Sequence, residues 1–326
     1  MTYTHTEVTA LGTTYNLPNF VGPMYFMTPK VNSLLAAIGG IGGGYEVMSE
    51  DVPFQLTGLP TAAQPAIVEG ADPALSMQTR QERYNILQIF QEGVKVSYSK
   101  LMATGQLGNT GTDTTPAYPV SGSSPIGNEY DWQMDRLVEK VSRDVNFSII
   151  QGTYQRPSDN ATGRKMRGLL AAITTHEEAG GAAALTKTMI DNVLLDVWGG
   201  NTGLVDPSPM TDPVFWLNGF QKQAFSGIYG YAPEHRNVGG VNINQIETDF
   251  GVVGIALDRL LPADDILLLD MSYVRMAHGV IPGKGVFFAE PLAQTGAAIV
   301  GQLYGEMCVD YGPEEFHGKI TNLATS

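Results

Sequence analysis

The chain has 326 residues, of which 43% are hydrophobic and 16% charged, and its formal net charge at pH 7 is −14. This composition is typical of a folded protein of one or two domains. Proteins that bind DNA or RNA directly neutralise phosphates with basic residues, so the acidic excess makes this role unexpected. No apolar run reaches about 18 residues and no apolar segment opens the sequence, so we expect neither a membrane span nor a secretory signal.

The first part of the sequence predicts an arm, a short helix and a long excursion. Residues 1–23 are polar, rich in threonine and without periodicity, which indicates an extended arm or a disordered tail. The apolar stretch 28–44 predicts a short helix that ends at Gly39-Gly40, because paired glycines commonly terminate helices. Prolines and glycines interrupt residues 45–83, so we expect a long loop and ribbon there.

A long extended run follows this excursion. After an apolar run at 86–90, apolar and polar residues alternate over 94–99 with the period of a strand. No proline interrupts the chain from Tyr84 to Ser99, and Gly93 is interpreted as a bulge. Such a strand would span roughly 50 Å, whereas a typical strand spans about 17–20 Å. Because a two-stranded ribbon is marginal alone and its open edges invite pairing, we expect neighbouring copies of the chain to cover it. The alternative is a β-rich soluble enzyme or binding protein with ordinary strands.

Helices are expected in the middle of the sequence. The strongest spans 127–152, where apolar residues recur at spacings of three and four and predict one buried face. Further helices are expected at 185–200, capped by Thr186, and at 212–227. The apolar residues of the strongest helix are Tyr130, Met134, Leu137, Val138, Val141 and Val145.

Strands dominate the last third. Three short strand-like runs cover 240–248, 251–258 and 265–270. A final strand of roughly 45 Å is expected over 297–311, because apolar and polar residues alternate there. It should end at Gly312-Pro313.

No motif for catalysis, cofactor binding or metal binding is complete. Residues 39–44 fail the spacing of a dinucleotide-binding loop, and 279–287 fail that of a phosphate loop. The five histidines lack metal-ligand spacing, and 175–178, "THEE", is expected to be a solvated charge cluster. The single cysteine, Cys308, excludes an internal disulfide and is expected to be a packed apolar residue. We therefore expect no enzyme activity, cofactor or metal.

Several stretches resemble those of a known family in their order and spacing: 83–99, 128–152, 164–175, 247–270 and 301–323. They resemble the major capsid proteins of tailed bacteriophages, which have the Hong Kong 97-like fold. The resemblance extends over roughly 24–323 and depends on no single motif. It implies an α+β chain whose parts are an N-terminal arm and short helix (1–45), an extended loop (46–90), a peripheral domain (91–185 and 286–326) with spine helix 128–152, and an axial domain (186–285).

The resemblance also implies a function. The chain would be a structural subunit, not an enzyme, that assembles into pentamers and hexamers of an icosahedral phage head. The head would enclose double-stranded DNA without specific binding, the subunit would lie in the virion after assembly in the host cytoplasm, and no membrane would be involved. Portal and decoration proteins would be further partners, and because the arm is too short for a fused scaffolding domain, scaffolding would be a separate protein or absent. An encapsulin-like cellular compartment shell is the alternative.

Charged residues of the excursion and of 164–167 are the candidates for contacts between subunits. The sequence Arg-Lys-Met-Arg at 164–167 would suit nucleic acid or the acidic surface of an adjoining subunit. The candidates are Glu69, Asp72, Arg80, Glu82, Arg83, Arg164, Lys165 and Arg167.

Overall fold

A computed structural model describes residues 32–58, 64, 66–73, 75, 77–104, 129–159, 161–199, 208–229, 244–294 and 296–325. The predicted arm 1–23 lies outside the described residues. The chain divides into two compact units. The first contains Phe90–Val141 and Phe287–Tyr304, and the second contains Asn32–Ile89, Ser142–Val286 and Gly305–Ser326. Each unit is described by itself below.

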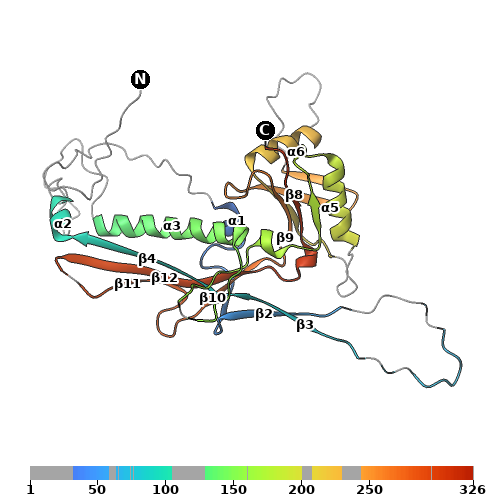
Figure 1. Ribbon diagram of the computed structural model, residues 1–326, viewed down its shortest axis with the longest axis horizontal. Helices are drawn as coiled ribbons and strands as arrows, with labels where there is room; N and C mark the ends of the chain where they lie inside the picture. The colour runs from blue at the N-terminus through green and yellow to red at the C-terminus, as the bar shows by residue number, and fades with distance from the viewer. Residues whose placement is uncertain are drawn as a thin grey trace. The chain divides into compact units, whose positions relative to one another are not determined.

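The core of the second unit is a six-stranded sheet in the order β5-β13-β9-β6-β8-β7. Helix α5 packs against β13 and β5, and α6 packs against β6 (Figure 1). All residues of β9 are buried, as expected of a strand covered on both faces. The elements are β5 (Glu177–Ala179), α5 (Lys187–Gly199), β6 (Pro213–Leu217), α6 (Gly219–Tyr229), β7 (Gln245–Thr248), β8 (Gly251–Leu257), β9 (Ile266–Asp270) and β13 (Gly318–Thr321).

The helix predicted over 212–227 is wrong in its first half, because Pro213–Leu217 form strand β6. This strand pairs with β8 in parallel and with β9 in antiparallel. Its aromatic residues Phe215 and Trp216 are buried. A short apolar run fits a buried strand as well as a helix, and here the neighbouring strands decide between them. The strands predicted over 251–258 and 265–270 are confirmed as β8 and β9. The strand predicted over 240–248 is confirmed for Gln245–Thr248, which form β7, whereas 240–243 lie outside the described residues.

The predicted helix at 185–200 is confirmed as α5. The hydroxyl oxygen of Thr186 accepts a hydrogen bond from the Met189 backbone N–H at 3.4 Å. An N-cap of this kind satisfies one of the N–H groups that a helix leaves without a partner in its first turn.

Replacing Thr186 with alanine is therefore expected to lower the free energy of unfolding by about 1 kcal/mol. Urea denaturation followed by circular dichroism measures this change. Thr186→Ser is the matched control, because it keeps the hydroxyl and should stay near the wild-type value. Equal stability of the alanine and serine variants would contradict the capping role.

A second sheet is arranged around β12 (Ala298–Asp310). In the first unit β12 pairs with β4 and β11, and in the second with β10, which pairs in turn with β1. The expected alternation is confirmed from Gly301 to Met307, where every second residue is buried. It does not continue to the end of the strand, since Cys308 and Asp310 are buried as well. The other strands are β1 (Tyr45–Val47), β4 (Gln88–Ser97), β10 (Arg275–Gly279) and β11 (Phe287–Pro291).

The single strand predicted over 84–99 is instead two strands and the start of a helix. Strand β3 (Gln81–Ile86) pairs with β2 (Asp51–Leu56), whereas β4 pairs with β12. The chain therefore exchanges one partner for another at Leu87, which belongs to neither strand. Strand β4 continues through its glycine, where a bulge was predicted, and ends where α2 (Tyr98–Thr104) begins.

The strongest predicted helix is confirmed as α3 (Glu129–Gln151). Within the second unit its inward face is completely buried at Val145 and Ile149. The prediction for Val138 is wrong, since this side chain is 37% exposed. No helix among the described residues is long and apolar enough to cross a membrane. The remaining short helices are α1 (Ser33–Ala37), α4 (Leu169–Ala172) and the 3-10 helix η2 (Glu314–Phe316).

Helix α1 ends at the predicted glycines, with Gly39 at φ +100° and Gly40 at φ +74°. Its first turn is held by side chains distant in the sequence. The Leu34 N–H donates to Asp258 at 3.0 Å, and the Leu35 N–H donates to Asn146 at 2.9 Å. The helix is thus capped by side chains from the body of the second unit.

Candidate inter-subunit surface

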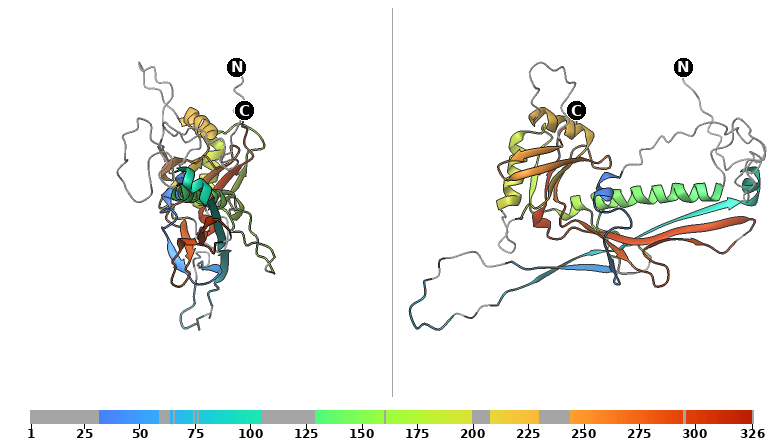
Figure 2. Two further views of the ribbon diagram at one scale, coloured as in Figure 1. Left: turned by 90° about the vertical axis from the view of Figure 1, so that its left-hand side faces the viewer. Right: turned by 180° about the vertical axis from the view of Figure 1, so that it is seen from behind.

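Strands β2 and β3 form an extended hairpin, paired from Asp51 with Ile86 to Leu56 with Gln81. Figure 2 shows this hairpin leaving the rest of its unit. Every described residue between 64 and 82 is exposed. The second unit therefore leaves this part of the chain without a covering layer, as expected for the long excursion.

The hairpin tip, residues 66–79, combines exposed apolar side chains with acidic charge. Burial of apolar surface stabilises a structure by about 25 cal/mol per Å², so these side chains favour association with another surface. Between 57 and 79 the only charged residues are Glu69 and Asp72. The apolar residues and their exposed fractions are Ile67 (73%), Val68 (79%), Leu75 (97%) and Met77 (92%).

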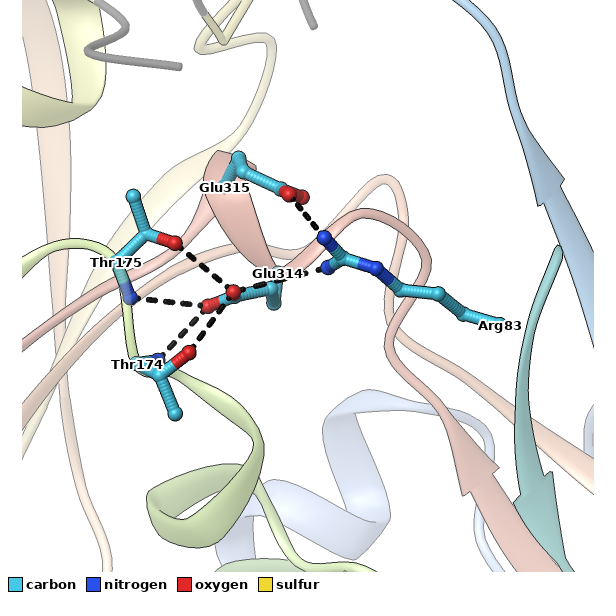
Figure 3. Close-up of polar contacts among 5 residues, drawn as sticks. All are labelled: Arg83, Thr174, Thr175, Glu314 and Glu315. Carbon is cyan, nitrogen blue, oxygen red and sulfur yellow. Dashed lines mark hydrogen bonds and ion pairs between the residues drawn. The ribbon is translucent and has the colours of Figure 1, made fainter. Parts of the chain in front are cut away.

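A partly buried ionic cluster fixes the base of the hairpin (Figure 3). The guanidinium of Arg83, on β3, lies 2.6 Å from Glu315 Oε1 and 3.6 Å from Glu314 Oε1. Both glutamates belong to η2, directly after the Gly312-Pro313 stop of β12, and both are buried. Arg83 therefore ties the hairpin to the turn that follows β12.

Glu314 is the most strongly bound member of this cluster. Its carboxylate accepts hydrogen bonds from the backbone N–H and the hydroxyl of both Thr174 and Thr175, at 2.8–3.2 Å (Figure 3). Burial alone raises the pKa of Glu314, but these hydrogen bonds outweigh it and hold the pKa below its ordinary value. Glu314 is therefore ionised at neutral pH, with its charge compensated.

A second attachment comes from residues 153–168, which we call the strap. Its two arms are joined by backbone hydrogen bonds between Gln155 and Lys165, both at 3.0 Å. The Arg156 guanidinium lies 2.9 Å from Asp51 on β2 and 5.5 Å from the centre of the Tyr84 ring on β3. The strap thus binds both strands of the hairpin near their base.

The predicted contact residues fall into two groups. Arg83, Arg164 and Arg167 are bound within the chain; Arg164 lies 3.2 Å from both Glu50 and Glu306. The Arg167 guanidinium lies 4.7 Å from the centre of the Tyr154 ring in the strap. The others are exposed on the hairpin or strap: Glu69, Asp72, Arg80, Glu82 and Lys165.

Two histidines next to the ionic cluster correct a sequence expectation. His176, of the stretch expected to be solvated, is buried, and burial lowers its pKa against the opposing effect of Asp196, Glu314 and Glu315. His317 is completely buried; its Nδ1 accepts the Asp270 N–H at 3.2 Å and its Nε2 lies 2.7 Å from the Tyr311 carbonyl oxygen.

These contacts require the neutral form of His317 with the proton on Nε2, and burial lowers its pKa accordingly. Cys308 is buried, as predicted. Within the described ranges, no group of three His, Cys, Asp or Glu side chains is arranged to hold a metal ion.

Sequence reasoning missed Glu314, Glu315 and the buried Asn85 on β3. A glutamate pair after Gly-Pro has the pattern of an ordinary surface turn, and an asparagine within a strand carries no motif. Only the position of β3 beside the end of β12 brings these residues together. No signal in the sequence would have identified them.

Comparison with solved structures shows a common fold. The capsid of cyanophage A-1(L) has a TM-score of 0.64 at 9% identity, with 94% of this chain and 96% of that chain covered. The capsid of a native GTA particle has a TM-score of 0.59 at 13% identity, covering 93% and 96%. The holo-SrpI encapsulin complex of Synechococcus elongatus has a TM-score of 0.53 at 12% identity, covering 94% and 91%. The predicted α+β, Hong Kong 97-like fold is confirmed.

Sequence comparison identifies the family. No curated protein sequence gave a significant match. The family model described as SU10 major capsid protein matches residues 4–324. Since this match covers nearly the whole chain, the protein belongs to the SU10 major capsid protein family, and its role is that of a structural virion subunit that assembles with copies of itself.

Proposed function

We propose that this chain forms the pentamers and hexamers of an icosahedral phage head that encloses double-stranded DNA. The observation that carries the proposal is the extended hairpin, which is fixed at its base and exposed at its tip. A neighbouring copy of the chain would cover this tip. Since each subunit offers a tip and receives one, the same contact repeats around the shell, and repeated burial stabilises the particle although each contact is modest.

We assign the parts of the chain as the family resemblance implies. Residues 1–45 would form the arm and short helix, 46–90 the extended loop, and 186–285 the axial domain around the five-fold and six-fold axes. Most of the six-stranded sheet, with α5 and α6, falls within the last range and supports this assignment. The peripheral domain would combine 91–185 and 286–326, with α3 as its spine helix.

Charge complementarity suggests where the tip binds. The tip carries Glu69 and Asp72 without a basic residue, whereas Lys165 is exposed on the strap. The tip of one copy would therefore lie against the strap of the next, with Arg80 and Glu82 at the edge of the contact. Complementary charges of this kind set the register of an interface more than its strength.

Changing the four apolar tip residues Ile67, Val68, Leu75 and Met77 to serine is expected to abolish particle formation. The fold should be unaffected, since the side chains are exposed. Negative-stain microscopy and light scattering measure assembly, with the chain expressed alone and together with the other head proteins of its phage. Circular dichroism measures the fold.

The matched control changes polar residues of the same excursion, Gln64, Gln78 and Thr79, to serine, and particles should persist. Particles formed at wild-type yield by the apolar variant would contradict the proposed role of the tip. A wild-type chain that stays monomeric in both settings would contradict the shell itself.

The fold shared with an encapsulin supports one alternative, a compartment shell. The net charge of −14 supports a head whose wall does not bind its DNA specifically. Assembly would take place in the host cytoplasm, with portal and decoration proteins as further partners. Nucleic acid in purified particles would support the phage head, whereas a protein cargo without nucleic acid would support the compartment.

A further inference from the structure

Asn85 lies at the base of the extended hairpin and is completely buried. Its side chain uses its full hydrogen-bonding capacity. The carbonyl oxygen accepts the N–H groups of Arg167 and Ile86, both at 2.9 Å. The amide nitrogen donates to the carbonyl oxygens of Arg167 at 3.1 Å and Val309 at 2.8 Å.

These bonds join three segments that are distant in the sequence. The paired bonds with the Arg167 backbone copy those of neighbouring strands, so the side chain of Asn85 connects β3 to the strap. The bond to Val309 connects it to β12 as well. No other side-chain type of this size offers two donors and two acceptors in this geometry, since aspartate lacks the donors and leucine lacks both.

A small error at the base of the hairpin becomes large at its tip. Ten extended residues, as from Asn85 to Leu75, reach roughly 30 Å. A rotation of about 10° at the base would therefore move the tip by about 5 Å, which is more than a hydrogen bond or an apolar contact tolerates. A two-stranded ribbon is too weak alone to correct such an error.

We propose that Asn85 is a positioning residue, which fixes the direction of the extended hairpin so that its tip meets the next copy of the chain. The inference rests on the proposed function of the tip. It predicts that loss of Asn85 impairs assembly more than its effect on stability explains.

The structure offers a closely matched control in Asn146. It is also an asparagine, completely buried and in the same unit, and it binds the Leu35 N–H and Asp258 rather than the hairpin. Asn85→Ala and Asn146→Ala should both lower the melting temperature. Only Asn85→Ala should increase the exchange rate of the β2 and β3 amides, by at least tenfold, and reduce particle yield by at least tenfold.

Hydrogen exchange is measured on the unassembled chain, so it remains informative even if the wild type forms no particles and the proposed function fails. Hairpin amides that exchange equally in both variants would overturn the inference, as would increased exchange with full particle yield. If Asn85→Ala does not fold, Arg156→Ala removes the partly exposed contacts of the strap with Asp51 and with the Tyr84 ring. Arg156→Ala should increase the hydrogen-exchange rate of the β2 and β3 amides and reduce the particle yield, each by a smaller factor than expected for Asn85→Ala. If neither the exchange rate nor the yield changed, the inference would be overturned.

Discussion

Replacing Glu314 with alanine is expected to lower the free energy of unfolding by about 1.5–3 kcal/mol, the usual contribution of hydrogen bonds to a charged group. The substitution leaves the N–H and hydroxyl donors of Thr174 and Thr175 without their acceptor, and leaves Arg83 with Glu315 alone. Since a domain is stable by only about 5–15 kcal/mol, this is a large part of the total. Urea denaturation of the purified chain measures it.

Glu82→Ala provides the comparison, because Glu82 lies on the same hairpin but is exposed. It should change stability little. Glu315→Ala should cost less than Glu314→Ala, since one oxygen of Glu315, Oε2, is buried without a hydrogen-bond partner among the described residues. A Glu314→Ala variant as stable as Glu82→Ala would show that the cluster does not fix the hairpin.

The elements predictable from sequence were those whose pattern is long. Helix α3 shows its apolar face over many turns, and β12 alternates from Gly301 to Met307, so each pattern identifies one type of element. The exposed excursion was also predictable, because its prolines and glycines exclude helix and its length exceeds that of an ordinary loop.

The errors have one physical cause, which is that tertiary pairing decides what a short run becomes. No proline or glycine marks a break at Leu87, yet the pairing partner changes there from β2 to β12. The apolar residues of β6 would suit either type of element, and the sheet makes them a strand. The anchoring residues could not be predicted for the same reason, since Arg83 and Glu314 become neighbours only in the folded chain.

The stability of the chain is expected to fall as the pH decreases from 6.5, because two buried histidines must stay neutral. Burial lowers the pKa of both His176 and His317 in the folded chain. Above pH 6.5 they are neutral in both states, and their contribution is fully present. Below pH 6.5 the unfolded chain binds protons first, so the free energy of unfolding decreases. Once the pH is below the pKa of a histidine in the folded chain, the stability lost is about 1.4 kcal/mol for each unit by which burial lowers that pKa.

A separate loss should begin near pH 4.5. The pKa of Glu314 is also lowered in the folded chain, so the unfolded chain takes up this proton first as the pH falls. The carboxylates that face the two histidines do not reverse the loss of stability that these histidines cause below pH 6.5. Asp196, Glu314 and Glu315 face His176, and Asp270 and Glu314 face His317, yet burial outweighs them in both cases.

Urea denaturation at pH 7.5, 6.5, 5.5 and 5.0 tests the histidine effect apart from that of Glu314. His317→Asn keeps an acceptor for the Asp270 N–H but cannot titrate. The slope of its free energy of unfolding against pH should therefore be smaller than that of the wild type by up to about 1.4 kcal/mol per pH unit, the value for one proton. The variant should still lose stability below pH 4.5. A wild-type free energy of unfolding that is constant from pH 7.5 to 5.0 would contradict the neutral-histidine argument. A His317→Asn variant whose free energy of unfolding changes with pH as steeply as that of the wild type would also contradict it. In that case the pKa of His317 would be the same in the folded and unfolded chains, and burial would not keep this histidine neutral.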